Sequence, residues 1–200
     1  MQAPDTLHLF TMSYPYGNGE PFIENELNFL ASKFNKIYIY PSVSDPAISR
    51  IPANATIIDL DSNKIKFSAL SVMLKNIRLV ISIHFNEIIK SPKKGTYIRH
   101  FREFNSRLLK SIVLANRIRS LIKEAPTKKD IFYSFWMNEN AMALSILKCR
   151  KVIQNFVFRA NGFDLYDIQA RHNYIPFRPF IFRQVDKMFA VAKKGSDYMK

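Results

Sequence analysis

The residues best suited to chemistry lie in one segment near the carboxyl end of the sequence. Arg159-Ala-Asn161-Gly162-Phe-Asp164-Leu-Tyr166 is polar, contains a glycine and follows an apolar run rich in β-forming residues. The amide of Asn161 can both donate to and accept from a hydroxyl group. Asp164 could serve a ligand or cap its own loop, and Arg159 could pair with Asp164 or face an anion. Ligands of parallel α/β sheets bind outside the carboxyl ends of the strands, so we predict a site here.

A second candidate loop, Tyr16-Gly17-Asn18-Gly19-Glu20, follows an apolar run near the amino end. Its backbone N–H groups and the helix expected after it could bind a phosphate or a sugar. The alternative is a tight turn that needs only the conformational freedom of glycine. The spacing fits neither a dinucleotide fingerprint, since the third residue after Gly19 is Phe22, nor a P-loop.

Six short β-rich runs alternate with helical patterns and would position these loops. We predict strands over 7–12, 36–40, 55–60, 130–136, 152–158 and 187–192, and helices over 20–34, 66–90, 96–123 and 138–147, with a short helix after residue 166. This alternation predicts a Rossmann-like, doubly wound, mostly parallel sheet with helices on both faces. Residues 1–200 are expected to form one domain, into which a basic helical pair is inserted at about 64–129.

Composition favours a globular chain in a reducing compartment. Of the 200 residues, 48% are hydrophobic, which provides material for a buried core, and the single Cys149 rules out a disulfide framework within the chain. The amino terminus does not resemble a signal peptide, and no apolar run is long enough to span a membrane. We therefore predict a cytoplasmic protein.

The positive charge is concentrated in one part of the chain. Residues 64–129 hold sixteen Lys or Arg against three acidic residues, a net charge of +13, whereas the whole chain carries +14. The predicted helix over 96–123 places apolar residues on one face and Arg99, Arg102, Lys110, Arg117 and Lys123 on the other. The basic face could be merely solvated, or it could bind an anionic membrane. Nucleic acid is disfavoured because the aromatic residues have the spacing of a packed helix face. The more apolar helix over 66–90 is predicted to be sandwiched.

Several motifs together resemble the N-terminal, acceptor-side domain of GT-B glycosyltransferases, above all the retaining family 4. The matching segments are Ser13-Tyr-Pro-Tyr-Gly-Asn-Gly-Glu-Pro-Phe-Ile-Glu-Asn-Glu-Leu27, Tyr133-Ser-Phe-Trp136-Met, Phe158 to Tyr166, Tyr174-Ile-Pro-Phe-Arg178 and Val191-Ala-Lys-Lys-Gly-Ser-Asp-Tyr198. Each motif is loose, and the order and spacing of the set carry the resemblance over nearly the whole chain. The family usually has His where this chain has Asn161, and an amide lacks the positive charge available to imidazole.

The resemblance implies the acceptor-binding half of an enzyme that moves a hexosyl group from a nucleotide-sugar to a saccharide, here a lipid-linked one of a surface polysaccharide. It assigns Asn161 and Asp164 to the reaction and Tyr16 to Glu20, Trp136, Arg159 and Gly162 to substrate binding. It implies a reaction that needs neither a metal nor a cofactor. It also implies a separate nucleotide-binding domain, which we do not find in this chain, and a location at the inner face of the plasma membrane. We therefore expect this chain alone to be inactive. The alternative is a non-catalytic basic module that docks on an anionic membrane or a partner protein.

Residues with metal-binding side chains show no suggestive spacing. His8, His84, His100 and His172 are scattered, and Cys149 belongs to no cluster. Glu24 and Glu26 are interpreted as solvated helix residues, and the alternative is that one of them lines the acceptor pocket.

Overall fold

The centre of the fold is a six-stranded parallel sheet. The computed structural model describes residues 6–44, 49–60, 66–122 and 125–198. The strands are β1 (Thr6–Thr11), β2 (Lys36–Pro41), β3 (Ala55–Ile57), β4 (Ile131–Ser134), β5 (Asn155–Ala160) and β6 (Lys187–Ala190). Their order is β3-β2-β1-β4-β5-β6, and every neighbouring pair is parallel. This is the strand order of doubly wound dinucleotide-binding folds, so the predicted fold class is confirmed.

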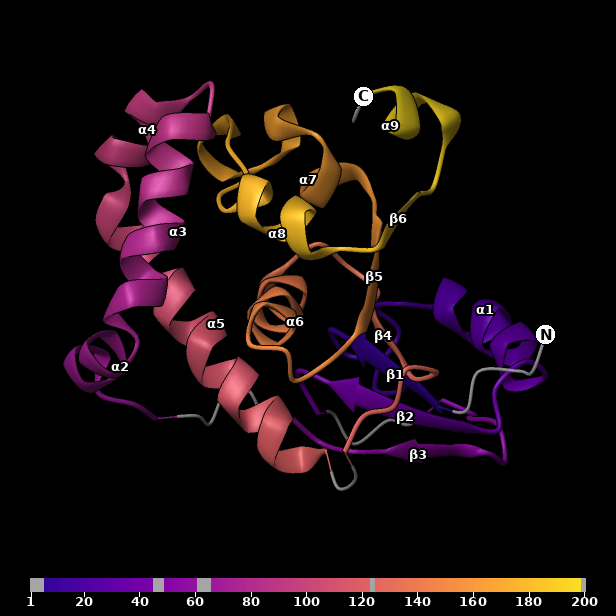
Figure 1. The fold of residues 1–200 in the computed structure, drawn as a ribbon. Coiled ribbons are helices and arrows are strands. Elements are labelled where there is room, and N and C mark those ends of the chain that lie inside the picture. Colours follow the sequence, from indigo (N-terminus) through magenta and orange to yellow (C-terminus); the bar gives the residue numbers. More distant parts are fainter. Residues whose placement is uncertain (1–5, 45–48, 61–65, 123–124, 199–200) are drawn as a thin grey trace.

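Helices cover both faces of the sheet. Over the described residues the helices are α1 (Phe22–Ala31), α2 (Ala69–Lys75), α3 (Ile77–Lys90), α4 (Lys94–Arg99), α5 (Phe101–Leu121), α6 (Glu139–Cys149), α7 (Gly162–Leu165), α8 (Arg178–Gln184) and α9 (Lys193–Tyr198), with 3-10 turns at Asp167–Gln169 and Arg171–Asn173. Figure 1 shows α1 on one side of the sheet and α5, α6 and α8 on the other. The long stretch between β3 and β4 therefore forms a helical layer to one side of the strands.

Two apolar clusters form the core, one on each face of the sheet. Leu7 and Leu9 of β1 pack with Leu27 of α1, whereas Phe10 and Phe132 belong to the larger cluster with α5, α6 and α8. Because β1 is buried on both faces, even its polar residues His8 and Thr11 lie inside the fold. The edge strand β3 does not share this burial, because its residues are half-buried or exposed.

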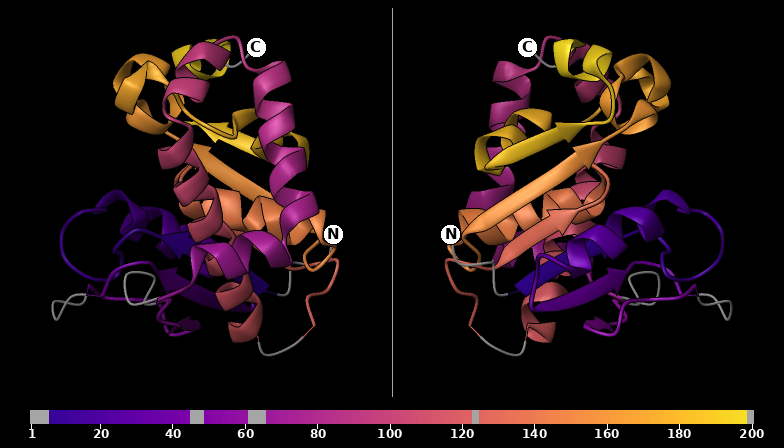
Figure 2. Two further views of the ribbon diagram at one scale, coloured as in Figure 1. Left: turned by 90° about the vertical axis from the view of Figure 1, so that its left-hand side faces the viewer. Right: turned by 90° about the vertical axis from the view of Figure 1, so that its right-hand side faces the viewer.

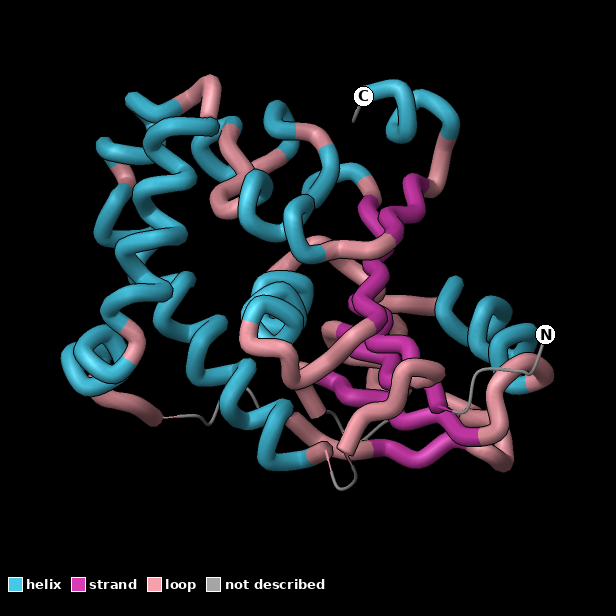
Figure 3. The backbone as a smooth tube through the Cα atoms, in the orientation of Figure 1, coloured by secondary structure: helices cyan, strands magenta, loops and turns pink. Residues whose placement is uncertain are grey.

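The two long helices predicted over 66–90 and 96–123 are each interrupted. Asn76 separates α2 from α3 with φ −125° and ψ 20°, and His100 separates α4 from α5 with φ −106° and ψ 22°. The Asn76 amide donates to the Val72 carbonyl (2.8 Å) and accepts from Arg150 (2.6 Å). These side-chain hydrogen bonds compete with the helical backbone pattern. The breaks appear as loop in Figure 3, so the described part of the insertion, residues 66–122, forms the four helices α2 to α5.

Strand β5 begins later than predicted. Lys151 adopts a left-handed conformation (φ 58°) directly after α6, and the turn that follows delays the strand to Asn155. The strand then continues to Ala160, so Arg159 lies in the sheet and not in the following loop. The shift moves Arg159 away from the site that the sequence predicts for it.

None of the helices within the described ranges combines the length and the apolar content needed to cross a bilayer.

Candidate functional site

A cavity of about 250 Å³ lies at the carboxyl edge of the sheet. Its walls come from the segments after β1, β4 and β5, from α5 and from the stretch before α8. They include Met12, Arg107, Ser111, Met137, Asn138, Glu139, Met142, Phe163, Asp164, Gln169, Ala170, Arg171, Tyr174, Ile175, Pro176, Phe177 and Ile181. The strand order reverses between β1 and β4, and ligands of open α/β sheets bind at such a point. The cavity is thus the candidate site.

Glu20 holds the loop after β1 in place. Its buried carboxylate accepts from the backbone N–H groups of Met12 (3.2 Å), Ser13 (2.8 Å) and Tyr14 (2.7 Å). The indole Nε1 of Trp136 also donates to it. The Ser13 hydroxyl is a fifth donor (3.4 Å). Because five protein donors share the two oxygens, Glu20 positions both loops, and a direct contact with substrate would require displacing one of these donors.

The rest of the predicted glycine loop lies outside the cavity wall. Gly17 has φ +61°, a left-handed conformation that favours glycine, and a side chain on Gly19 would meet Ser13 Oγ at 3.1 Å. Tyr16 is half-buried and Asn18 is exposed. These features fit the tight-turn interpretation, and contact with a ligand stays a prediction.

Asp164 ties the loop after β5 to the loop after β4. Its buried carboxylate accepts from the backbone N–H of Asn161 (2.6 Å) and from that of Met137 (2.8 Å). With Asn161 as N-cap, Asp164 forms the capping box of α7. Burial raises the pKa of Asp164, and the hydrogen bonds from Met137 and Asn161 oppose that rise. The capping role that the sequence left open is therefore present, while catalytic roles for Asp164 and Asn161 remain predictions.

Replacing Asp164 with alanine should destabilise the fold by about 2 kcal/mol, because two buried N–H groups lose their acceptor. Asp164→Asn should cost less, since its amide oxygen can still accept one of these bonds. Urea unfolding followed by circular dichroism measures both free energies. Equal stability of the wild type and Asp164→Ala would contradict the capping role.

The Arg159 side chain does not pair with Asp164, and it does not face the cavity. Its guanidinium contacts the Glu26 carboxylate at 2.6 Å and lies 4.7 Å from the centre of the Phe135 ring. Glu26 also accepts from the Tyr133 hydroxyl (2.7 Å). Glu26 is thus a partner within the fold, contrary to its interpretation as a solvated residue. Arg159 does not line the cavity, and its role in substrate binding stays a prediction.

Aromatic rings stand beside the cavity. Trp136 stacks on Phe163 with ring centres 5.2 Å apart, and Phe163 is half-exposed while Trp136 is largely buried. Next to Phe163 in the sequence, a Cβ added to Gly162 would lie 2.5 Å from the carbonyl oxygen of the Gln169 side chain. Gly162 therefore allows Gln169 to approach the loop closely, which is a positioning role.

Sequence reasoning missed the charged wall of the cavity. Arg107 of α5 lies 3.7 Å from Glu139 at the start of α6, and Arg171 lies across the same cavity. The side chain of Asn138 caps α6 by accepting from Asn140 N (2.9 Å). Asn138 and Glu139 directly follow a predicted strand and could have been found, whereas Arg107 looked like one more residue of a basic helix.

The proposed membrane-facing residues lie at the surface. Arg99, Arg102, Lys110 and Arg117 are all exposed, and Lys123 lies outside the described residues.

Among the described residues, one group could hold a metal ion. The fold brings His100, Glu103 and His172 together, with all ligand atoms within 4.8 Å of one another. His172 donates to Glu103 (3.0 Å) and Arg171 contacts the other carboxylate oxygen (3.2 Å). The hydrogen bond from His172 lowers the pKa of Glu103, and the charge of Arg171 adds to the effect. Because Arg171 already satisfies this carboxylate and would repel a cation, an ion pair explains the group better than a metal.

Comparisons of the chain with protein families, with curated proteins and with solved structures found no match. A function therefore has to be inferred from the fold and from the site geometry.

Proposed function

We propose that the chain is the acceptor-binding half of a retaining glycosyltransferase that moves a hexosyl group from a nucleotide-sugar to a lipid-linked saccharide. The observation that carries the proposal is the cavity at the β1/β4 reversal of the strand order. It combines an apolar aromatic wall with a few convergent polar groups, the usual make-up of a small-molecule site. A saccharide would place its hydroxyls against Arg107, Glu139 and Gln169, with Phe163 as an apolar wall.

The role of this chain in the reaction is to bind and orient the acceptor. Asn138, Glu139 and Arg107 offer both donors and acceptors, which a hydroxyl-rich ligand needs. Donor binding and the departure of the nucleotide belong, by the resemblance, to a second domain. Asn161 would contact the transferred sugar by hydrogen bonds alone, since an amide carries no charge.

The proposal predicts saccharide binding without turnover. Mono- and disaccharides should shift NMR signals of cavity residues, and Arg107→Ala should weaken this binding about tenfold, the loss of one charged hydrogen bond. Lys33→Ala, far from the cavity on the chain after α1, is the matched control. UDP-, GDP- and ADP-hexoses with a polyprenyl-linked saccharide should give no product with this chain alone. Absence of saccharide binding would refute the acceptor role, and appreciable turnover would refute the division between two domains.

A second candidate is a non-catalytic module that docks on an anionic membrane or a partner protein. The concentration of exposed basic residues on α4 and α5 favours it. Membrane binding is compatible with both candidates, so the saccharide titration separates them: a pure docking module has no use for a sugar-binding cavity.

A further inference from the structure

Large apolar side chains are exposed on the outer side of α2 and α3. We define the apolar face as the side chains of six residues, Leu70, Leu74, Ile77, Ile81, Phe85 and Ile89. Their exposed fractions run from 41% for Ile77 to 62% for Leu70 and Phe85. On α3 the exposed residues recur every four positions, so they share one side of the helix. Figure 2 shows α2, α3 and α4 in front of the rest of the chain in its left view. The sandwiched position predicted for this segment is therefore wrong.

The other side of α3 already anchors the helix. Val80, Ile83 and His84 are buried, and buried Glu87 accepts a hydrogen bond from the Tyr174 hydroxyl. The His84 imidazole contacts the hydroxyl of Tyr97 on α4 (2.5 Å). The core thus uses one side of α3 and leaves a second apolar side in water. An exposed apolar patch of this kind indicates an interaction surface.

The exposed charges on the helices that carry the apolar face, and on the two helices that follow them, are positive. Exposed Lys75, Arg78, Lys90, Lys94, Arg99 and Arg102 lie on α2 to α5. Residues 66–122 contain only two acidic side chains, and neither opposes this charge: Glu87 is buried, and Glu103 pairs with Arg171. A second copy of the chain would bring two basic surfaces together, and nucleic acid gains little from isoleucine or leucine. Exposed apolar side chains together with basic ones fit a lipid bilayer, whose headgroups can be anionic and whose acyl chains below them are apolar.

We propose that the apolar face docks on a bilayer containing anionic lipids, with α3 in the plane of the interface. Phe85, Ile81 and Ile89 enter the boundary of the acyl chains, while lysine and arginine side chains contact lipid headgroups. This binding does not depend on the proposed transferase activity. It would, however, serve that activity: α5 packs on α2 and α4, and Arg107 on α5 lines the cavity, so a lipid-linked acceptor would lie close to the site.

Vesicle flotation tests the docking. The protein should float with vesicles of phosphatidylcholine mixed with phosphatidylserine and remain behind with phosphatidylcholine alone, and high salt should weaken the binding. Replacing Ile81, Phe85 and Ile89 together with serine should weaken binding at least about tenfold, because the apolar contribution is lost. Replacing Arg78, Lys90 and Arg99 with alanine should weaken it about a hundredfold.

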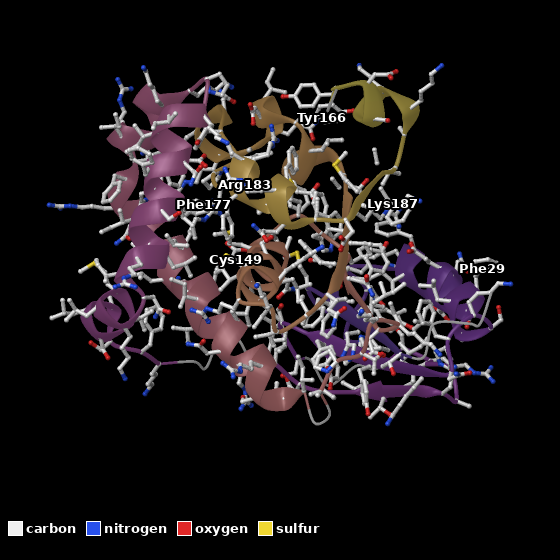
Figure 4. The ribbon with its side chains drawn as sticks, viewed as in Figure 1. Phe29, Cys149, Tyr166, Phe177, Arg183 and Lys187 are labelled. Carbon is white, nitrogen blue, oxygen red and sulfur yellow. The ribbon has the colours of Figure 1, made fainter. Side chains whose placement is uncertain are left out.

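Matched controls separate this face from a general effect of surface substitutions. Phe29→Ser removes an equally exposed apolar side chain from α1, on the opposite side of the molecule (Figure 4), and should leave binding unchanged. Lys33→Ala serves the same purpose for charge. Binding to anionic vesicles that survives the triple serine substitution would overturn the proposal. A lipid-free dimer that this substitution dissociates would assign the face to a second copy instead.

Depth in the bilayer provides an independent measurement. Trp136 is the only tryptophan and is largely buried near the carboxyl edge of the sheet, so brominated lipids should not quench the wild-type emission. A Phe85→Trp variant adds a second tryptophan on the apolar face, and its emission should be quenched on anionic vesicles. No additional quenching in vesicle-bound Phe85→Trp would rule out insertion of α3.

Discussion

Glu20→Ala should destabilise the protein by about 3–5 kcal/mol, the largest effect that we expect from a single substitution. The Glu20 carboxylate is the acceptor for three consecutive backbone N–H groups after β1 and for the indole of Trp136 after β4. An alanine leaves these donors without a partner in a largely buried place. The two loops would then lose their common anchor, and saccharide binding should weaken together with stability.

Equilibrium unfolding in urea, followed by circular dichroism, measures this loss. The free energy of unfolding of Glu20→Gln should lie between those of Glu20→Ala and the wild type. Its amide keeps one acceptor oxygen but turns an NH₂ group toward the backbone donors. Glu24→Ala, at an exposed position in the first turn of α1, should change stability by no more than about 0.5 kcal/mol. If Glu20→Ala were as stable as Glu24→Ala, the anchoring role would be refuted. Trp136 emission should also move to longer wavelength in Glu20→Ala.

The fold could be predicted because its signals are local. Each strand is a short β-rich run, and the turn after β1 is marked by glycine. Helix interruptions were missed because the interruption at Asn76 depends on Arg150, which lies 74 positions away. A periodic pattern continues through such a break, so the sequence reads as one helix. The same pattern could not reveal that one apolar side of α3 faces solvent, since core and interface residues have the same composition.

The site was predictable only in its location. The loops after β1, β4 and β5 do gather at one edge, as the carboxyl ends of parallel strands must. What each side chain does there depends on distant partners: Arg159 meets Glu26 across 133 positions, and Glu20 meets Trp136 across 116. In both cases a charged residue that suggested ligand binding is used within the fold. Arg107, which does line the cavity, comes from a helix whose basic face the sequence left as either solvated or membrane-binding.

Acid should destabilise the protein through His8. The imidazole stacks on Phe132 with ring centres 4.3 Å apart, and its Nδ1 lies 3.0 Å from the Tyr40 hydroxyl. Burial lowers the pKa of His8 from 6.5 to about 4, with Asp130 opposing the shift and Lys36 adding to it. Above pH 6.5 the imidazole is neutral in both states and folding is unaffected. As the pH falls from 6.5 toward 4, His8 binds a proton in the unfolded chain but stays neutral in the folded chain. The free energy of unfolding therefore decreases by about 3 kcal/mol.

The variant His8→Gln separates this charge effect from packing. Glutamine can still form a hydrogen bond with Tyr40 but does not titrate, so it should be less stable than wild type at pH 7 because the stacking on Phe132 is lost. Between pH 6.5 and pH 4 the two stability curves should converge, because only the wild type loses stability through the protonation of His8 in its unfolded state. Urea unfolding at a series of pH values measures both curves. Curves that stay parallel over this range would show that His8 accepts its proton in the folded state, and that burial in the sheet does not hold it neutral.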